Sequence, residues 1–422
     1  MTEEPTADRP SGDGLLAAIS VYDIFLITAG LWFLGKFIRY AFPPLFEEFQ
    51  ASYTVSTTEI GLAYSGFLLL YALMQFPSGA LADRFGSVRV ITGGALLAAV
   101  GALIILTKPT FLVLAFAMVI VGAGTGAHKT VSVRLLSNIY PRHLGRALGV
   151  FDTIGTMGGV IAPLLIAAIL FFGVLGWPGF FGITGLVIAV AAIEFYRRGS
   201  GENGVGDDAS NTDTVLPLRS YRRTFSQPSV LAFALLTVLV AFAYNGLVSF
   251  LPLYLTVEGG LSPAIASALY SFLFIASVVQ ILSGEAADRF GALSTLTIGI
   301  ITAMVGMAGL LGVTYLGGGE LTSTLGVVSI ILVVSLIGIG AHGYRPARDV
   351  YIVSIVPDAT TGGTLGVIRT LLMGSAAVAP AVVGAIGDWL SLFEAFLLLT
   401  VVAGFAAAIA LLLLVTNRST TQ

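Results

Sequence analysis

The stretch GALADRFG, Gly79–Gly86, places an aspartate and an arginine between two glycines in a chain that is otherwise largely apolar. A near copy, GEAADRFG, follows at Gly284–Gly291, a shift of 284 − 79 = 205 residues. Glycine permits tight turns and close backbone approach, so each copy predicts a tight connection between the ends of two helices. The charged pair predicts that this connection lies at a membrane surface, where water solvates it. The repetition indicates that the chain contains two related parts.

The composition of the chain predicts an integral membrane protein. Of its 422 residues 56% are hydrophobic and 10% are charged, and the mean hydropathy is +0.96. A soluble chain carries about 25% charged residues, so most of these side chains must face lipid or each other. A net charge of −3 without a basic run excludes nucleic acid as a partner. The chain has no cysteine and three scattered histidines, so we expect neither a metal site nor a cofactor.

Apolar runs long enough to span a bilayer define the expected helices, since a spanning helix needs about 20 such residues. Segments of this length exclude a barrel, whose strands are about 10 residues long. We find twelve runs, at 17–42, 58–81, 88–107, 110–139, 144–173, 177–197, 228–255, 262–284, 292–315, 323–355, 363–387 and 390–416.

Basic residues in the short loops predict the orientation of these spans. Only Lys108 lies in loops on one side, together with several glutamates. Cytoplasmic loops are enriched in Lys and Arg, so we expect a plasma-membrane protein with both termini in the cytoplasm. The polar, acidic first fourteen residues do not resemble a signal peptide. The arginines of the other side are Arg84, Arg89, Arg142, Arg146, Arg197, Arg198, Arg219, Arg222, Arg223, Arg289 and Arg418.

A polar stretch in the middle divides the chain. Residues 199–227 are rich in Gly, Ser, Asn and Asp and predict a flexible cytoplasmic linker between an N-terminal half, 1–198, and a C-terminal half, 228–422. The halves match beyond the opening motif, because Gly149 and Pro163 recur 217 residues later as glycine and proline. We therefore expect an all-α polytopic membrane protein with twelve transmembrane helices in two pseudo-symmetric six-helix halves.

With these motifs the sequence resembles the major facilitator superfamily. GALADRFG matches that family's motif between helices two and three, the second half repeats the motif with Ala286 in place of its leucine, and the resemblance covers all twelve spans. It implies a monomeric secondary transporter that works by rocker-switch alternating access. In the family, the motif's aspartate packs against the start of helix eleven and holds the cytoplasmic side shut.

The resemblance therefore implies that Asp83 faces residues 362–364, whose free N–H groups and helix dipole favour a carboxylate by about 1 kcal/mol. Asp288 would face helix five near Gly145 and Arg146. Alternatively, these charges are solvated loop residues that only fix the topology. The predicted gating motif comprises Gly79, Asp83, Arg84, Gly86, Gly284, Asp288, Arg289 and Gly291.

Ionisable residues inside spans are functional candidates, because each costs at least about 2.5 kcal/mol there. Lys36 and Arg39 lie three residues apart on one face of helix one, and Lys129 maps to Arg345 at a shift of 216. The stretch GAGTGA before Lys129 predicts close helix packing or room for a ligand. Asn245 matches Lys36 at a shift of 209. These five residues are the predicted substrate-binding set, in a cavity lined by helices one, four, seven and ten.

Simpler roles are open for several of these residues. Arg39 could extend to the outer interface, and Lys129 and Arg345 could pair between helices. Arg348 and Asp349 are expected to form an interfacial pair. Asp152, which maps to Arg369 at a shift of 217, is either a proton carrier, because burial disfavours a carboxylate, or half of a structural ion pair. His128 and His342 are expected to bond to helix partners, and Asp23 is a further candidate buried anion.

The excess of buried cations predicts a negatively charged cargo such as a carboxylate or phosphate. We expect a transporter of a small anion, coupled to a proton or a counter-substrate through Asp152 and Arg369. No phosphate-binding loop is present, so ATP hydrolysis is not encoded. The alternative within transport is drug–proton antiport, suggested by an incomplete antiporter motif in helix five. A sensor on the same fold would need a larger soluble domain, and no nucleophile–base cluster indicates an enzyme.

Overall fold

The computed structural model describes residues 12–140, 144–200, 225–317, 321–356 and 361–420. Within these ranges the chain is almost entirely helical, without a β-strand. Twelve of the described helical segments are long and apolar enough to cross a membrane. The predicted fold class and the predicted number of spans are therefore confirmed.

In the N-terminal half, a 3₁₀ turn and a short helix follow the first span. The hydropathy pattern did not predict these two elements. Its elements are α1 (Gly12–Ala41), η1 (Pro43–Leu45), α2 (Phe46–Tyr53), α3 (Thr57–Phe85), α4 (Ser87–Leu106), α5 (Phe111–Ile139), α6 (Leu144–Phe172) and α7 (Gly176–Gly199).

The C-terminal half differs from the prediction in its second span, which a 3₁₀ turn interrupts. Its elements are α9 (Pro228–Val257), α10 (Pro263–Ile275), η2 (Ala276–Val278), α11 (Val279–Phe290), α12 (Ala292–Gly317), α13 (Thr324–Ile355), α14 (Thr361–Trp389) and α15 (Leu392–Thr420). Ser277 is the one polar residue of η2, and its neighbours Ala276 and Val278 are apolar, so hydropathy alone does not reveal the tighter winding.

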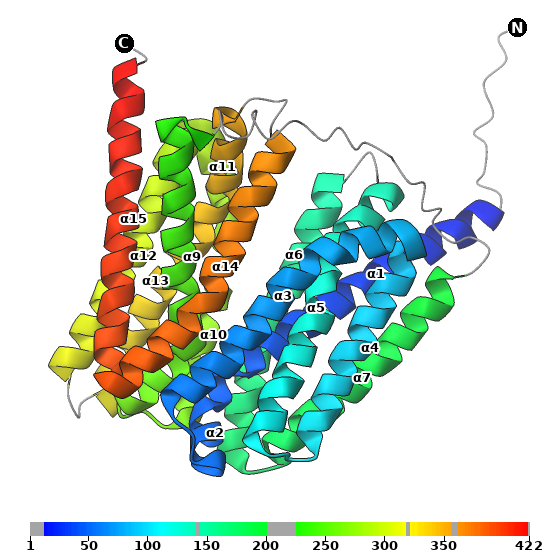
Figure 1. Ribbon diagram of the computed structural model, residues 1–422, viewed down its shortest axis with the longest axis horizontal. Helices are drawn as coiled ribbons and strands as arrows, with labels where there is room; N and C mark the ends of the chain where they lie inside the picture. Colours follow the sequence, from blue (N-terminus) through cyan, green and yellow to red (C-terminus); the bar gives the residue numbers. More distant parts are fainter. Residues whose placement is uncertain (1–11, 141–143, 201–224, 318–320, 357–360, 421–422) are drawn as a thin grey trace, which may run out of the picture.

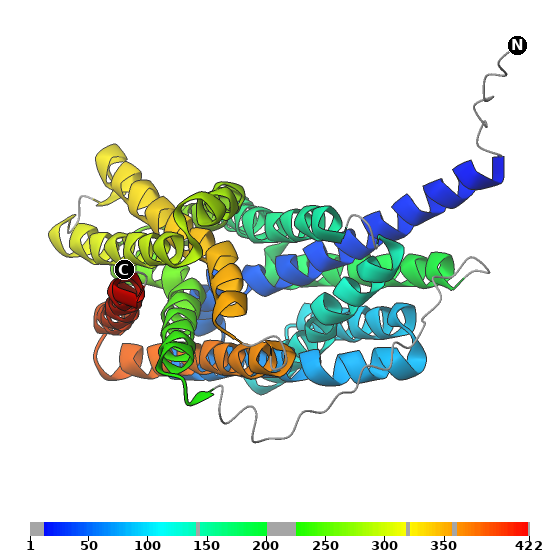
Figure 2. The ribbon, with the colours of Figure 1, turned by 90° about the horizontal axis from the view of Figure 1, so that it is seen from above.

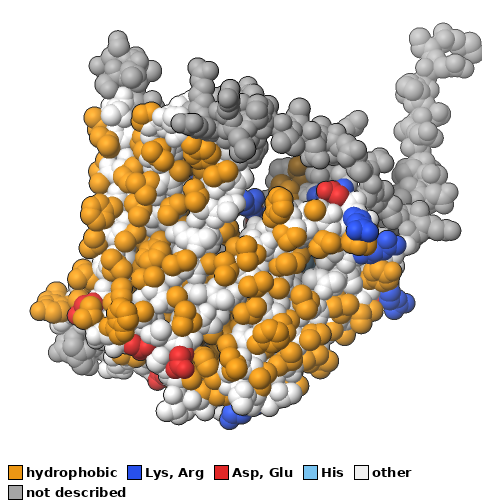
Figure 3. Space-filling view, in the orientation of Figure 1, with side chains coloured by type: hydrophobic (Ala, Val, Ile, Leu, Met, Phe, Trp, Pro, Cys, Tyr) orange, Lys and Arg blue, Asp and Glu red, His pale blue; other side chains and the backbone are white. Residues whose placement is uncertain are grey.

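The two halves lie side by side as two bundles of helices (Figures 1 and 2). α1 begins and α15 ends on the same side, at the top of Figure 1, which we call the termini side; the opposite side is the far side. The visible flank is mostly hydrophobic, and its charged side chains gather toward the upper and lower edges (Figure 3). This distribution fits a protein that contacts lipid around its middle. Most of the predicted linker lies outside the described residues, and the domain boundaries stay a prediction.

The opening motif is helical rather than a loop. α3 continues to Phe85, and only Gly86, with φ of 87°, forms the turn into α4. Gly291, with φ of 88°, ends α11 in the same way. Alanine, leucine and arginine are good helix formers, so each helix runs beyond its apolar segment. The prediction of a tight turn holds for the second glycine of each copy, whereas the first glycine lies inside the helix.

Glycines bring helices of the same half into backbone contact. A Cβ atom at Gly122 of α5 would overlap the carbonyl oxygen of Phe67 in α3, and one at Gly126 would overlap that of Tyr71. In the other half, a Cβ at Gly340 of α13 would overlap the backbone of Ala303 in α12. The GAGTGA stretch therefore serves close helix packing, the first of its two predicted roles.

This packing gives a test of stability. We expect Gly122→Ala to destabilise the protein by about 1–3 kcal/mol, because the added methyl group forces α5 away from α3. Gly93→Ala in α4 is the matched control, since a Cβ there meets no atom within 4 Å. Thermal melting in detergent should show a lower Tm for Gly122→Ala and an unchanged or higher Tm for Gly93→Ala. Equal melting temperatures for both variants would contradict the packing.

The two halves touch mainly through α3 with α14 and through α6 with α10. A Cβ at Gly61 of α3 would overlap the carbonyl oxygen of Pro380 in α14, so the two backbones are in contact there. Pro380 disrupts the hydrogen bonding of its own helix. The amide of Ala381 instead donates to Ser65 Oγ of the other half at 2.9 Å.

Asp388 completes the contact on the far side. Its Oδ1 accepts from the amide of Thr57 at 3.0 Å, and its Oδ2 accepts from the amide of Thr58 at 2.8 Å. These amides form the first turn of α3, where N–H groups lack helical partners and the helix dipole favours a carboxylate. We call this interaction of Asp388 with Thr57 and Thr58 the far-side cap.

Candidate substrate-binding cavity

A cavity of about 230 Å³ lies between the two halves. All five residues of the predicted binding set line it, and so does Arg369. Besides the four expected helices, α3 and α14 contribute to its wall. The polar and aromatic lining residues are Trp32, Lys36, Arg39, Tyr40, Tyr71, Gln75, Lys129, Tyr244, Asn245, Tyr344, Arg345, Arg348 and Arg369.

Trp32 of α1 lies between two lysines. Lys36 Nζ is 5.1 Å from the centroid of its ring and Lys129 Nζ is 5.3 Å from it. Lys36 Nζ also donates to Thr156 Oγ1 at 3.4 Å. Phe151 stacks on Trp32 with the ring centroids 5.8 Å apart. Contact with an aromatic face stabilises a cation without neutralising it, so the charge of Lys36 is available to a ligand.

Arg39 reaches across the cavity from one half to the other. Its guanidinium lies 5.0 Å from the ring centroid of Tyr71 and 5.4 Å from that of Tyr40, and it donates to Asn245 Oδ1 of α9 at 3.4 Å. Its buried Nε has no hydrogen-bond partner. Arg39 therefore does not extend to the outer interface, which was the alternative that its sequence position left open.

Arg345 of α13 likewise rests on an aromatic ring rather than on an acid. Its guanidinium carbon is 5.1 Å from the ring centroid of Tyr244. The Tyr244 hydroxyl is 3.3 Å from His342 Nε2, in agreement with the expected helix-partner role of that histidine. His128 Nε2 is similarly 3.3 Å from the carbonyl oxygen of Thr28. Arg345 forms no salt bridge with any residue of the described ranges.

Acidic residues neutralise two other cations of the wall. Asp152 pairs with Lys129, which is the structural arrangement of the two roles considered for Asp152. Arg348 pairs with Asp349 at 2.7 Å, as predicted, but Arg348 also lines the cavity, which the sequence analysis missed. A usable signal was present, because Arg348 follows Arg345 by three residues, the spacing of Lys36 and Arg39.

Asp23 lies outside the cavity. Its carboxylate pairs with Arg198 of α7 at 2.7 Å, and its side chain is 40% exposed. The expectation of a second buried anion in this region is therefore wrong. Asp23 lies near the end of the α1 segment that projects on the termini side, where water solvates it.

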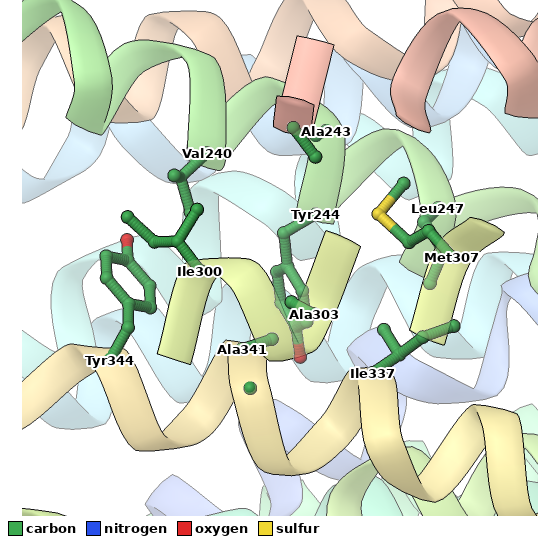
Figure 4. A pocket seen from close by; sticks show the side chains of 12 residues that line it. Val240, Ala243, Tyr244, Leu247, Ile300, Ala303, Met307, Ile337, Ala341 and Tyr344 are labelled. Atoms are coloured by element: carbon green, nitrogen blue, oxygen red, sulfur yellow. The ribbon is translucent and has the colours of Figure 1, made fainter. Parts of the chain in front are cut away.

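A smaller apolar pocket of about 30 Å³ lies behind Tyr244 (Figure 4). Tyr244 projects from α9 toward Ala341 of α13, with Leu247 and Met307 on one side of it (Figure 4). This pocket has room for about one water molecule, so it cannot hold a cargo of its own. Of these two hollows, the larger one carries the charged side chains.

Among the described residues, the ion pairs of the gating motif lie within one half. Asp83 pairs with Arg134 of α5, in its own half, and Arg289 pairs with Glu285 at 2.6 Å within α11. Asp288 is exposed. Asp83 was expected to face the N–H groups of residues 362–364, and the surroundings of residues 362 and 363 lie outside what the structure describes. The contact implied by the resemblance is not the one seen here, and the gating role stays a prediction.

The cavity extends toward the termini side. α14 starts on that side, and Arg369, near its start, is exposed, whereas Met373 and Ala376 lie progressively deeper along the helix. A basic side chain is visible in the hollow between the halves (Figure 3). Together with the far-side cap, this describes a molecule that is closed at the far side and accessible from the termini side.

Twelve spanning helices in two matching halves around a central polar cavity define the architecture of a secondary transporter. The chain belongs to the Major Facilitator Superfamily, because the sequence model of that family matches residues 24–336. It is therefore a multi-pass membrane transporter and not an enzyme. The fold is similar to that of a bacterial homologue of the human lysosomal transporter Spinster, which was solved in an inward-facing and unoccupied conformation. The two structures superpose with a TM-score of 0.76 at 16% sequence identity, and the match covers 96% of this chain and 98% of that one.

The similar proteins of known name carry different cargoes. A hexuronate transporter of Bacillus subtilis is 26% identical over 416 residues, which are 91% of this chain and 92% of the relative. A probable L-galactonate transporter of Escherichia coli is 28% identical over 152 residues, 34% of this chain and 32% of the relative. A multidrug resistance protein B homolog of Mycobacterium tuberculosis is 28% identical over 164 residues, 37% of this chain and 30% of the relative.

Proposed function

We propose that this protein carries a small anion across the plasma membrane by rocker-switch alternating access, coupled to a proton or a counter-substrate. The observation that carries the proposal is the set of cations on the cavity wall. Lys36, Arg39, Arg345 and Arg369 line one cavity, and none of them forms a salt bridge within the described ranges. Unpaired charges in a partly buried site are costly, and an anionic ligand removes that cost.

The relatives support an anionic cargo. A relative matched over 91% of this chain is a hexuronate transporter, and a second relative is a probable L-galactonate transporter. Both names describe sugar acids, which are anions at neutral pH. The multidrug resistance relative is the basis of the alternative proposal, drug–proton antiport, but it matches over a smaller part of the chain. A cavity with excess positive charge disfavours the cationic drugs that such a protein could carry.

The arrangement of the halves supports alternating access. The conformation described here is accessible from the termini side, which the distribution of arginines assigns to the cytoplasm. In the opposite state, the halves would separate at the far-side cap and approach each other at the gating motif. Asp83 would then leave Arg134 for the start of α14. Asp152 would couple the cycle, because separating it from Lys129 leaves a carboxylate that can take up a proton.

Flux measurements test this function directly. In proteoliposomes with an imposed pH gradient, we expect uptake of radiolabelled sugar acids, and we expect Lys36→Gln combined with Arg345→Gln to reduce it by at least about 10-fold, because the anion loses two cationic partners. Arg197→Gln, an exposed residue paired with Glu194, is the control and should transport normally. Unchanged anion flux in the double variant, or transport of cationic drugs only, would refute the proposal.

A further inference from the structure

The charges on the cavity wall do not balance. Six basic side chains line the cavity, and two of them are paired with acids, Lys129 with Asp152 and Arg348 with Asp349. The described wall therefore carries an excess of 6 − 2 = 4 positive charges. Lys36, Arg39 and Arg345 rest on aromatic faces, and Lys36 and Arg39 also donate to neutral acceptors, which leaves the net charge unchanged.

The excess lies on both halves of the protein. Lys36 and Arg39 belong to α1, whereas Arg345 belongs to α13 and Arg369 to α14. In the open conformation water and salt screen the repulsion between the two sets. When the halves close around a cargo, this screening decreases and the repulsion increases, because the effective dielectric constant falls.

A single negative charge satisfies only one of the two sets of cations. It would neutralise one charge of the excess and leave the other half of the wall without a partner during closure. A cargo with two separated anionic groups would place one group against α1 and the other against α13 and α14. Such a cargo would attract the halves to each other and would favour the closed state over the open one.

We propose that the cargo is a small organic molecule with at least two anionic groups, and that Arg369 recognises the second of them. This inference rests on the proposed anion transport and narrows it. Arg369 suits the role because it stands at the termini-side end of the cavity, is exposed and has no salt-bridge partner in the described ranges. Arg39 and Arg345 lie deeper and rest on tyrosine rings.

Binding of matched anions tests the inference. Purified protein would be titrated at constant ionic strength with butyrate and succinate, which have four carbons each and differ in one carboxylate, and with the corresponding five-carbon pair, valerate and glutarate. We expect each dianion to bind at least about 10-fold more tightly than its monoanion. Arg369→Gln should reduce this preference to within about 2-fold, because it weakens dianion binding more than monoanion binding, and Arg369→Lys should retain most of it.

The outcomes separate the two proposals. Arg197→Gln should behave as the unmodified protein, and melting curves should show that the Arg369 variants are folded. Equal binding of monoanions and dianions, or a dianion preference that survives Arg369→Gln, would overturn the inference. If transport of a monoanion still requires Lys36 and Arg345, the proposed anion function stands without it. If no anion of either class binds and none is transported, both proposals fail.

Discussion

Replacing Arg39 by alanine is expected to reduce anion transport by roughly 100-fold, which corresponds to a loss of about 3 kcal/mol in interaction with the cargo. Arg39 is the candidate that links both halves, because it rests on Tyr71 of α3 and donates to Asn245 of α9. Its Nε is buried without a partner, so the guanidinium keeps a donor for a ligand. Alanine removes the charge, the ring contacts and this donor together.

Arg39→Lys distinguishes charge from shape. Lysine keeps the positive charge but lacks the planar group that stacks between two tyrosine rings and donates in two directions, so we expect it to restore no more than about one tenth of the lost activity. Initial rates of uptake in proteoliposomes, normalised to the amount of folded protein, measure both variants. Normal transport by Arg39→Ala would show that Arg39 is structural, and full activity of Arg39→Lys would show that only the charge matters.

Replacing Asp388 by alanine is expected to shift the protein toward the state that is open on the far side, by about 2 kcal/mol or roughly 30-fold in population. The estimate follows from the two hydrogen bonds between the carboxylate and the amides of Thr57 and Thr58, each worth about 1 kcal/mol or more for a charged acceptor. The capping box of α3 between Ser56 and Glu59 lies within one half and is not affected.

The absence of cysteine makes this shift measurable. Spin labels on introduced cysteines at Ser52 and Leu390, on either side of the far-side cap, would report the distance between the halves. We expect a longer distance to gain population in Asp388→Ala and, because the charge is lost, also in Asp388→Asn. Glu194→Ala, an exposed acid of α7, is the control. Identical distance distributions in all variants would show that the far-side cap does not hold the halves together.

The number and type of the spans could be predicted from sequence because the bilayer imposes one length and one composition on every helix. The finer features follow from other causes. The helix that contains most of GALADRFG continues to Phe85, beyond its apolar segment, because its last, charged turn is solvated and its residues favour helix. Hydropathy does not detect this extension. The 3₁₀ turn at Ala276–Val278 has neighbours of ordinary apolar type, so no composition signal marks it.

The candidate site could be assembled from sequence because the halves repeat. The shift that relates Lys129 to Arg345 placed both on the wall of one cavity, together with Lys36, Arg39 and Asn245. Contacts between the two halves are not marked by this repeat of the sequence. The far-side cap joins residues more than 300 positions apart, and the pair of Asp83 with Arg134 joins α3 to α5. Only three-dimensional packing decides such pairs.

The four unneutralised charges around the cavity also affect how readily the carrier would change state without a cargo. A carrier that alternates between two states leaks its gradient whenever it returns unloaded. Here the return would compress like charges against one another without a cargo to separate them, so the vacant cycle is disfavoured. Under the proposed mechanism we therefore expect return without a cargo to be slow, and an anion supplied on the opposite side of the membrane to accelerate uptake.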